Sequence, residues 1–249
     1  MTWGTFSPTH IVSLLAAVSI IVALYFSVFK LSARWQTIIL GILSFSGISA
    51  IIYNLVAWNS PLEYLPLHLC SINALLLPIV VFTRNKTLGN LLLFWSLGAL
   101  FALVLNNSMA EAKIFSLPFC FYYFPHVLEF GIPILLFKLG LVKKDYKCII
   151  STLGITLGIF IAVHFVNVAL NAFMIENNIT NYAGEVIQVN YMFTVSHDNL
   201  PLLTTFYSII PYSFWYLLLV LPIIAVYLVI LYIPQIIQRK KQKSEKQPQ

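Results

Sequence analysis

Long apolar runs alternate with short polar stretches along the whole chain. Seven of these runs have about the 20 residues that an α-helix needs to cross the hydrocarbon of a bilayer. The pattern therefore predicts an all-α fold, a polytopic membrane bundle of seven transmembrane helices. The expected helices cover residues 8–29, 35–57, 63–82, 88–106, 118–138, 148–170 and 207–233.

Composition favours the same fold class. Of the 249 residues, 60 % are hydrophobic and only 9 % are charged, and the mean hydropathy is +0.89. A soluble domain averages about 25 % charged residues, so an ordinary globular protein is excluded. The three cysteines, Cys70, Cys120 and Cys148, are too few and too scattered for a disulfide framework. We find no removable signal peptide and expect the first apolar run to stay as a spanning helix.

The basic residues are distributed unevenly between the loops. The net charge is +6, yet short basic blocks between apolar runs are typical of loops that set membrane orientation, and they argue against nucleic-acid binding. Every basic residue except Lys113 falls on one side of the predicted helices. The positive-inside rule then predicts an outer N-terminus and a cytoplasmic C-terminus. We expect a multi-pass protein of the cell membrane.

The connections divide the chain into a single transmembrane domain, residues 1–238, and a basic cytoplasmic tail, residues 239–249. The longest outer loop, residues 171–206, contains no Lys or Arg, and loops of this length are often functional. We expect the tail to be disordered and solvated at the anionic inner leaflet.

One predicted helix stands apart because its apolar sequence, residues 61–78, carries several polar side chains. His68, Cys70, Ser71 and Asn73 lie within six positions of one another. Polar groups are costly at membrane depth, so they usually face the interior of a bundle and mark a function. The predicted topology brings further polar residues to the same outer half of the membrane: Asn106, Asn107, His126, Glu129, His164, Asn167, Asn171, Asn190, Tyr191 and His197.

Helical spacing limits which of these groups can cooperate. His68 and Cys70 are roughly 200° apart around a straight helix, so a direct pair would require the chain to be unwound there. Cys70 and Asn73 share a face. If Cys70 is a nucleophile, a base must help because only the thiolate attacks, and His126 is the first candidate. Plain packing is the other interpretation, with Cys70 as a small core residue and His126 and Glu129 satisfying each other.

Four sequence signatures resemble one known family. They are Leu65-Pro66-Leu67-His68-Leu69-Cys70, Pro125-His126, Asn190-Tyr191-Met192-Phe193 and Pro211-Tyr212-Ser213-Phe214-Trp215-Tyr216. In order, length and span count the chain resembles the YwaF-like family of bacterial integral membrane proteins. That family tends to have an adjacent proline–tryptophan pair, whereas Pro211 and Trp215 are separated here. The bacterial family is similar to a eukaryotic multispanning family implicated in cysteine-dependent transfer of fatty acyl chains between phospholipids.

The resemblance implies a membrane-embedded lipid acyltransferase. Cys70 would be the acyl-accepting nucleophile, and His68 and His126 would be the histidines of the site. We expect membrane phospholipids as substrates, with no metal, cofactor or nucleic acid. Oxyanion donors are expected among Asn106, Asn107 and Asn190. The residues expected to bind the substrate are Asn106, Asn107, Asn190, Tyr191 and Glu129.

Two other classes of function remain open on the sequence. A transporter or permease-like protein would use the same outer polar groups to bind a small solute or a proton, although such proteins often show repeats and inner counterparts that this chain lacks. A non-catalytic scaffold would bind a partner through residues 171–206. Replacement of Cys70 separates the classes, because only the enzyme depends on its thiol.

Overall fold

In its described part, the computed structural model consists of helices joined by turns and loops, with isolated β-bridges and no strands there. This confirms the all-α class. The chain divides into two compact units, Met1–Lys144 and Asp145–Gln249, and each is described by itself. The described residues are 1–58, 60–105, 109–181, 184–198 and 200–245, with side chains up to residue 238.

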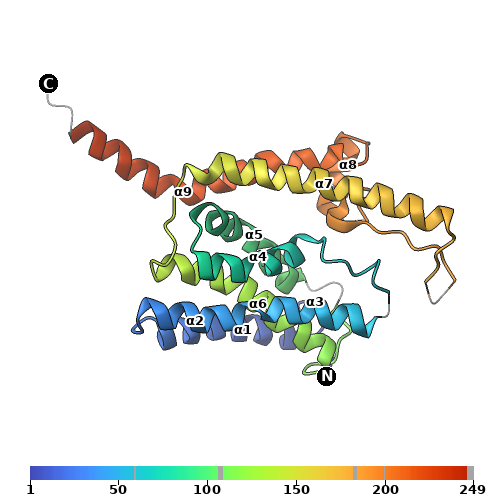
Figure 1. Ribbon diagram of the computed structural model, residues 1–249, viewed down its shortest axis with the longest axis horizontal. Helices are drawn as coiled ribbons and strands as arrows, with labels where there is room; N and C mark the ends of the chain where they lie inside the picture. The colour runs from blue at the N-terminus through green and yellow to red at the C-terminus, as the bar shows by residue number, and fades with distance from the viewer. Residues whose placement is uncertain (59, 106–108, 182–183, 199, 246–249) are drawn as a thin grey trace. The chain divides into compact units, whose positions relative to one another are not determined.

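The first unit is a bundle gathered around α6, Leu117–Lys138 (Figure 1). This helix packs against α1, α2, α3, α4 and α5. Side chains of α6 therefore meet those of several neighbours, which makes this helix the natural support for a shared site. The surrounding helices are α1 (Pro8–Val28), α2 (Ala33–Ser44), α3 (Ser46–Ala57), α4 (Leu69–Thr83) and α5 (Lys86–Leu105).

Local sequence explains where two of these helices begin. The Ser7 hydroxyl accepts a hydrogen bond from the His10 N–H of α1 at 3.1 Å, and the Ser116 hydroxyl accepts one from the Phe119 N–H of α6 at 3.4 Å. Each serine satisfies a backbone donor that the helix itself leaves unpaired. A proline lies in the first turn of both helices, where its missing N–H costs nothing.

Helix length and apolar composition confirm a multi-pass membrane protein. Among the described residues, six helical stretches are long and apolar enough to cross a membrane, and α4 is a shorter apolar helix. One of the six, Ala33–Ala57, combines α2 and α3 across a local break at Phe45.

The start of α4 differs from the sequence-based expectation. The pattern predicted a helix from residue 63, but residues 60–68 form turns and the helix begins at Leu69. Pro61 and Pro66 account for the difference, because proline lacks a backbone donor and disfavours helical geometry in the residue before it. Cys70 consequently lies in the first turn of a helix and not in its middle.

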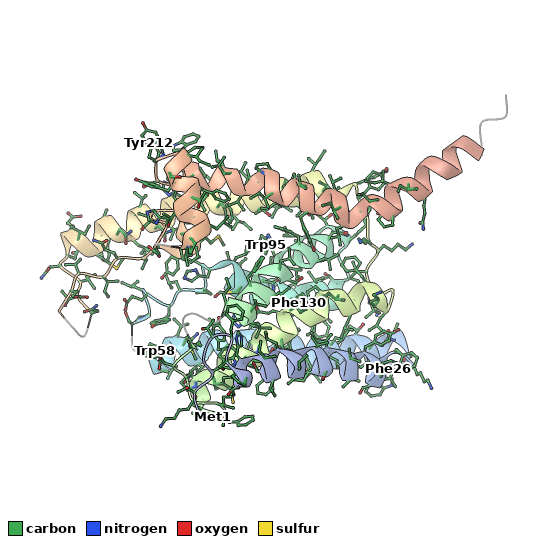
Figure 2. The ribbon with its side chains drawn as sticks, turned by 180° about the vertical axis from the view of Figure 1, so that it is seen from behind. Met1, Phe26, Trp58, Trp95, Phe130 and Tyr212 are labelled. Atoms are coloured by element: carbon green, nitrogen blue, oxygen red, sulfur yellow. The ribbon has the colours of Figure 1, made fainter. Side chains whose placement is uncertain are left out.

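Neighbouring spans of the first unit run in opposite directions. Figure 2 shows Phe26, near the end of α1, and Trp58, just after α3, at opposite ends of this unit, with Met1 at the end where Trp58 lies. The α1 helix and the Ala33–Ala57 stretch are therefore antiparallel, as alternating membrane crossings require. Which end faces the cytoplasm stays a prediction.

The segment before α1 folds against the bundle. Trp3 is fully buried, its N–H donates to the Ala112 carbonyl at 2.9 Å, and its indole Nε1 donates to Ser13 Oγ at 2.8 Å. The indole also meets the Phe119 and Tyr123 rings edge-on. The amino-terminal residues are thus part of the core of the first unit.

The second unit is built from α7 (Cys148–Glu176) and α9 (Val220–Glu245), which pack against each other. The α7 helix continues past the predicted end at residue 170, and the expected outer loop also contains η2 (Tyr191–Phe193) and α8 (Pro201–Ile209). The predicted loop is therefore partly helical.

The last predicted span is also interrupted. Residues 210–214 separate α8 from η3, Trp215–Leu219, and Pro211 lies in this break. Helix α9 then continues through Glu245, where a disordered tail was expected from residue 239. The reason is that residues 239–245 contain neither glycine nor proline and can extend the helix that precedes them.

Candidate functional site

The chain is unwound immediately before Cys70. His68 is the N-cap of α4 with extended backbone angles, φ −75° and ψ 154°, and its carbonyl accepts the first helical hydrogen bond, from the Ile72 N–H at 3.0 Å. The structure therefore meets the condition under which His68 and Cys70 can lie near each other. The first turn of a helix presents unpaired N–H groups and the positive end of the helix dipole, which favour negative charge on a thiolate.

Cys70 and Asn73 face the same residue across the bundle. The Glu129 carboxyl of α6 lies close to the Asn73 amide and near enough to the Cys70 thiol to interact with it electrostatically, and α4 packs directly against α6. The Ser71 side chain and nearby backbone N–H groups lie close to the thiol. The prediction that Cys70 and Asn73 share a helix face is confirmed, and both meet Glu129 on that face.

Several buried polar atoms in this group are unsatisfied. Asn73 is 0 % exposed and Glu129 is 4 % exposed, and within the described chain Asn73 Nδ2, Asn73 Oδ1 and Glu129 Oε2 have no hydrogen-bond partner. The two side chains are close, but no pair of their atoms has the geometry of a hydrogen bond. An unsatisfied buried polar group costs about 1–3 kcal/mol, so packing alone does not explain this pair.

Gly47 of α3 makes room for the carboxyl group. A Cβ atom added at this position would lie 2.5 Å from Ala74 Cβ and 2.8 Å from Glu129 Oε1. Such distances leave no space for a side chain. The absence of a side chain lets α3 approach α4 and α6 closely, which is a common use of glycine between membrane helices.

His126 lies one turn before Glu129 on α6 and pairs with the backbone of its own helix. Its Nδ1 donates to the Tyr122 carbonyl at 2.6 Å, because a carbonyl oxygen can only accept. In the neutral ring this bond leaves the lone pair on Nε2, so Nε2 can accept a proton. Among the described residues, no hydrogen bond joins the His126 ring to the Cys70 thiol or to Glu129.

Two asparagines of the second unit clamp the loop that follows α7. Buried Asn167 donates to the Tyr191 carbonyl at 2.8 Å and to Thr194 Oγ1 at 2.7 Å, and it accepts from the Tyr191 N–H at 3.1 Å. One turn later, Asn171 donates to the Val189 carbonyl at 2.9 Å and accepts from its N–H at 2.7 Å. We call Asn167, Asn171 and the backbone of residues 189–194 the loop clamp.

Asn190 organises the next part of the same loop. Its Nδ2 donates to the Ser196 carbonyl at 2.7 Å and to Asp198 Oδ2 at 2.8 Å. Its Oδ1 accepts from the N–H groups of Val195 and Ser196 at 2.9 and 3.2 Å. These bonds use both ends of the amide within the loop. The substrate-binding role of Asn190 and Tyr191 stays a prediction.

The remaining candidates fall outside this geometry. Asn106 and Asn107 lie outside the described residues. Across the described ranges, no group of three His, Cys, Asp or Glu side chains is placed to hold a metal ion.

Sequence reasoning missed the loop clamp and the role of Gly47. The i, i+4 spacing of Asn167 and Asn171, which puts both amides on one helix face, is the signal that could have revealed the clamp. For Gly47 the sequence offers no comparable signal, because its importance depends on which helix lies beside it.

Comparison with known proteins adds one finding. A search of curated proteins and a search of solved structures each find no match. A model of the TMEM164 family matches residues 5–232, which is most of both units. The chain therefore belongs to the TMEM164 family.

Proposed function

We propose that this protein is a lipid acyltransferase of the cell membrane that carries a fatty acyl chain on Cys70 as a thioester. The observation that supports the proposal best is the position of Cys70. Its thiol lies in the first turn of α4, directly after the unwound residue His68, and it faces the buried Glu129 carboxyl. A nucleophile that passes through an anionic state benefits from this end of a helix.

The reaction has two half-reactions with membrane phospholipids as donor and acceptor. In the first, Sγ of Cys70 attacks the carbonyl carbon of an acyl ester, and a histidine receives the thiol proton. The ester bond breaks, the lysophospholipid oxygen takes that proton, and the acyl chain stays on sulfur. In the second, an acceptor hydroxyl gives its proton to the histidine and attacks the thioester, which releases the thiol. His126 suits the histidine role because its Nε2 can accept a proton, and His68 is the other candidate.

The sequence signatures support the same proposal independently of the geometry. Leu65-Pro66-Leu67-His68-Leu69-Cys70 and Pro125-His126 resemble the YwaF-like family, which is similar to proteins implicated in cysteine-dependent acyl transfer. The first motif contains the turns before α4 and places Cys70 in the first turn of that helix, and the second contains His126, whose Nδ1 donates to the Tyr122 carbonyl.

The decisive experiment is covalent labelling with an acyl-phospholipid probe. Purified wild-type protein should take up the labelled acyl chain, and neutral hydroxylamine should remove it, because hydroxylamine cleaves thioesters. The Cys70→Ser variant should fold and remain unlabelled. Cys120→Ser is the matched control, since Cys120 is a partly buried cysteine of α6 with no role in the proposal, and it should label like the wild type. Equal labelling of wild type and Cys70→Ser would overturn the proposal.

The unsatisfied polar pair also favours a second candidate, a transporter or permease-like protein. Buried ionisable groups in membrane helices often mark the path of a solute or proton. Such a protein would tolerate Cys70→Ser and lose function with Glu129→Gln. An acyltransferase would instead lose its activity with Cys70→Ser. Transport and labelling assays on the same two variants therefore distinguish the classes.

A further inference from the structure

A buried amide beside the proposed nucleophile has both ends unpaired. Asn73 is completely buried, and neither its Nδ2 nor its Oδ1 has a partner within the described chain. Leucine would fill much the same volume without this penalty, since an apolar group of equal shape leaves no bond unmade. A polar residue kept at such a cost indicates a partner that is present only during function.

Helix geometry places this amide within reach of the reacting atoms. Asn73 lies three residues after Cys70 on α4, and side chains at this spacing are neighbours on one face, about 5–6 Å apart at Cβ. When Sγ attacks the carbon of an ester carbonyl, the carbonyl oxygen is only one bond from that carbon and therefore lies near the Cys70 side chain. The Asn73 Nδ2–H group therefore has its free donor where the carbonyl oxygen would become negative.

A second unpaired polar atom lies on α6, which packs against α4. Glu129 Oε2 has no hydrogen-bond partner in the described residues, and its carboxyl interacts with both Cys70 and Asn73. Burial of an isolated carboxylate is costly, so the uncharged acid is the form that this environment favours. The O–H of that acid is a hydrogen-bond donor. Gly47 allows the carboxyl to stay in place by leaving space for Oε1.

We propose that Asn73 Nδ2 and the protonated Glu129 carboxyl form the oxyanion hole for acyl transfer at Cys70. The inference rests on the acyltransferase function proposed above and names the groups that stabilise its tetrahedral intermediates. When Sγ bonds to the ester carbon, the carbonyl π-electron pair moves to oxygen, and the two donors bind that oxygen. When the carbonyl re-forms, the leaving lysophospholipid oxygen takes the proton removed from the thiol. The same donors serve the second half-reaction.

This assignment replaces the donors expected from the sequence. The Asn190 amide is occupied within its own loop, and Asn106 and Asn107 lie outside the described residues. Asn73 and Glu129, in contrast, are buried and unpaired beside the thiol. Donors held in a dry site act strongly because no solvent must reorganise around the developing charge.

The first test is Asn73→Leu in protein that lacks Cys120 and Cys148, so that Cys70 is the sole thiol. The rate of thioester formation should fall about 10²–10³-fold, which is typical for loss of one oxyanion donor. Alkylation of Cys70 by iodoacetamide should keep its wild-type rate, because displacement of iodide at a saturated carbon forms no oxyanion. Thermal stability should not fall, since no hydrogen bond is lost. A wild-type rate of thioester formation in folded Asn73→Leu would overturn the inference.

Asn90→Leu is the matched control. Asn90 is another buried asparagine of the first unit, but its Nδ2 donates to the carbonyls of Lys86 and Lys143 at 2.7 and 3.1 Å. Its replacement should lower stability and leave the rate of thioester formation per folded molecule unchanged. Asn73→Leu should slow thioester formation without a loss of stability, and Asn90→Leu should lower stability without slowing the reaction. This contrast separates a catalytic amide from a structural one.

The second test compares Glu129→Gln with Glu129→Leu and holds even if Asn73→Leu does not fold. Glutamine keeps an N–H donor at this position, so it should retain most of the rate and flatten any pH dependence that the carboxyl contributes. Glu129→Leu has no donor at this position, so its thioester formation should be much slower than in the wild type. Equal loss in both variants would overturn the donor role of Glu129. If wild-type protein forms no thioester at all, the proposed function itself fails. If the wild type forms the thioester and the variants match its rate, only the oxyanion-hole inference fails.

Discussion

Both units of this protein bury asparagine side chains, but Asn73 of the first unit differs from Asn167 and Asn171 of the second in its hydrogen bonds. In the loop clamp, Asn167 and Asn171 make bonds with both ends of their amides. In the first unit, Asn73 makes none in the described structure, and Glu129 has an unpaired oxygen beside it.

The difference shows how to separate structural from functional polar residues inside a membrane protein. A satisfied amide holds two parts of the chain together, and its replacement leaves backbone groups without partners. An unsatisfied amide stabilises nothing in the resting protein. Asn73 and Asn167 are the same residue type and equally buried, so only the hydrogen bonds distinguish them.

The largest effect on stability should come from breaking the loop clamp. Asn167→Leu removes three hydrogen bonds from a buried place, those to the Tyr191 N–H, to the Tyr191 carbonyl and to Thr194 Oγ1, and we expect a loss of about 3 kcal/mol in the free energy of unfolding. Denaturation in detergent micelles measures this loss, and limited proteolysis should show cleavage within residues 177–200. Asn73→Leu should be at least as stable as the wild type. Equal destabilisation by the two variants would contradict the comparison.

A smaller effect is expected from filling the space beside Glu129. Gly47→Ala forces α3 away from Ala74 and Glu129, and overpacking of this kind costs about 1–3 kcal/mol. It should also slow thioester formation, because the carboxyl is displaced. Gly98→Ala is the control: its new Cβ would lie 3.5 Å from Leu69 Cδ2, an ordinary contact, so stability should be unchanged or slightly higher. A neutral Gly47→Ala would mean that the three helices can separate freely.

The smallest effect should follow from Asn190→Ala. Its partners Ser196 and Asp198 lie in an exposed part of the loop, where water can replace the lost bonds. We expect a loss of about 1 kcal/mol and faster proteolysis of the loop. Unchanged stability together with slower thioester formation would show instead that this amide acts on the substrate.

The sequence predicted the fold class because long apolar runs have few solutions in a bilayer. It misplaced the start of the helix that carries Cys70, since hydropathy does not distinguish an apolar turn from an apolar helix. Nor does hydropathy show that the Tyr216 side chain is fully buried, with its hydroxyl donating to the Phe193 carbonyl.

The candidate site was predictable in part. Spacing alone put Cys70 and Asn73 on one face and singled out Glu129 and His126. It did not show that the Glu129 carboxyl lies close enough to the Cys70 thiol to interact with it, because that depends on the rotation of α6 against α4. Nor did it show that Asn73 is unpaired, since hydrogen bonds depend on neighbours from other helices.

The shortness of α4 has a consequence for the depth at which chemistry can occur. Its 15 residues span about 22 Å, at about 1.5 Å per residue, whereas the hydrocarbon layer is about 30 Å thick. A crossing at this place must be completed by the turns of residues 60–68, whose backbone needs polar surroundings. Cys70 then lies near the boundary between acyl chains and headgroups. Phospholipid ester bonds occupy that same boundary, so the donor lipid of the proposed reaction would present its carbonyl to the thiol without leaving the membrane.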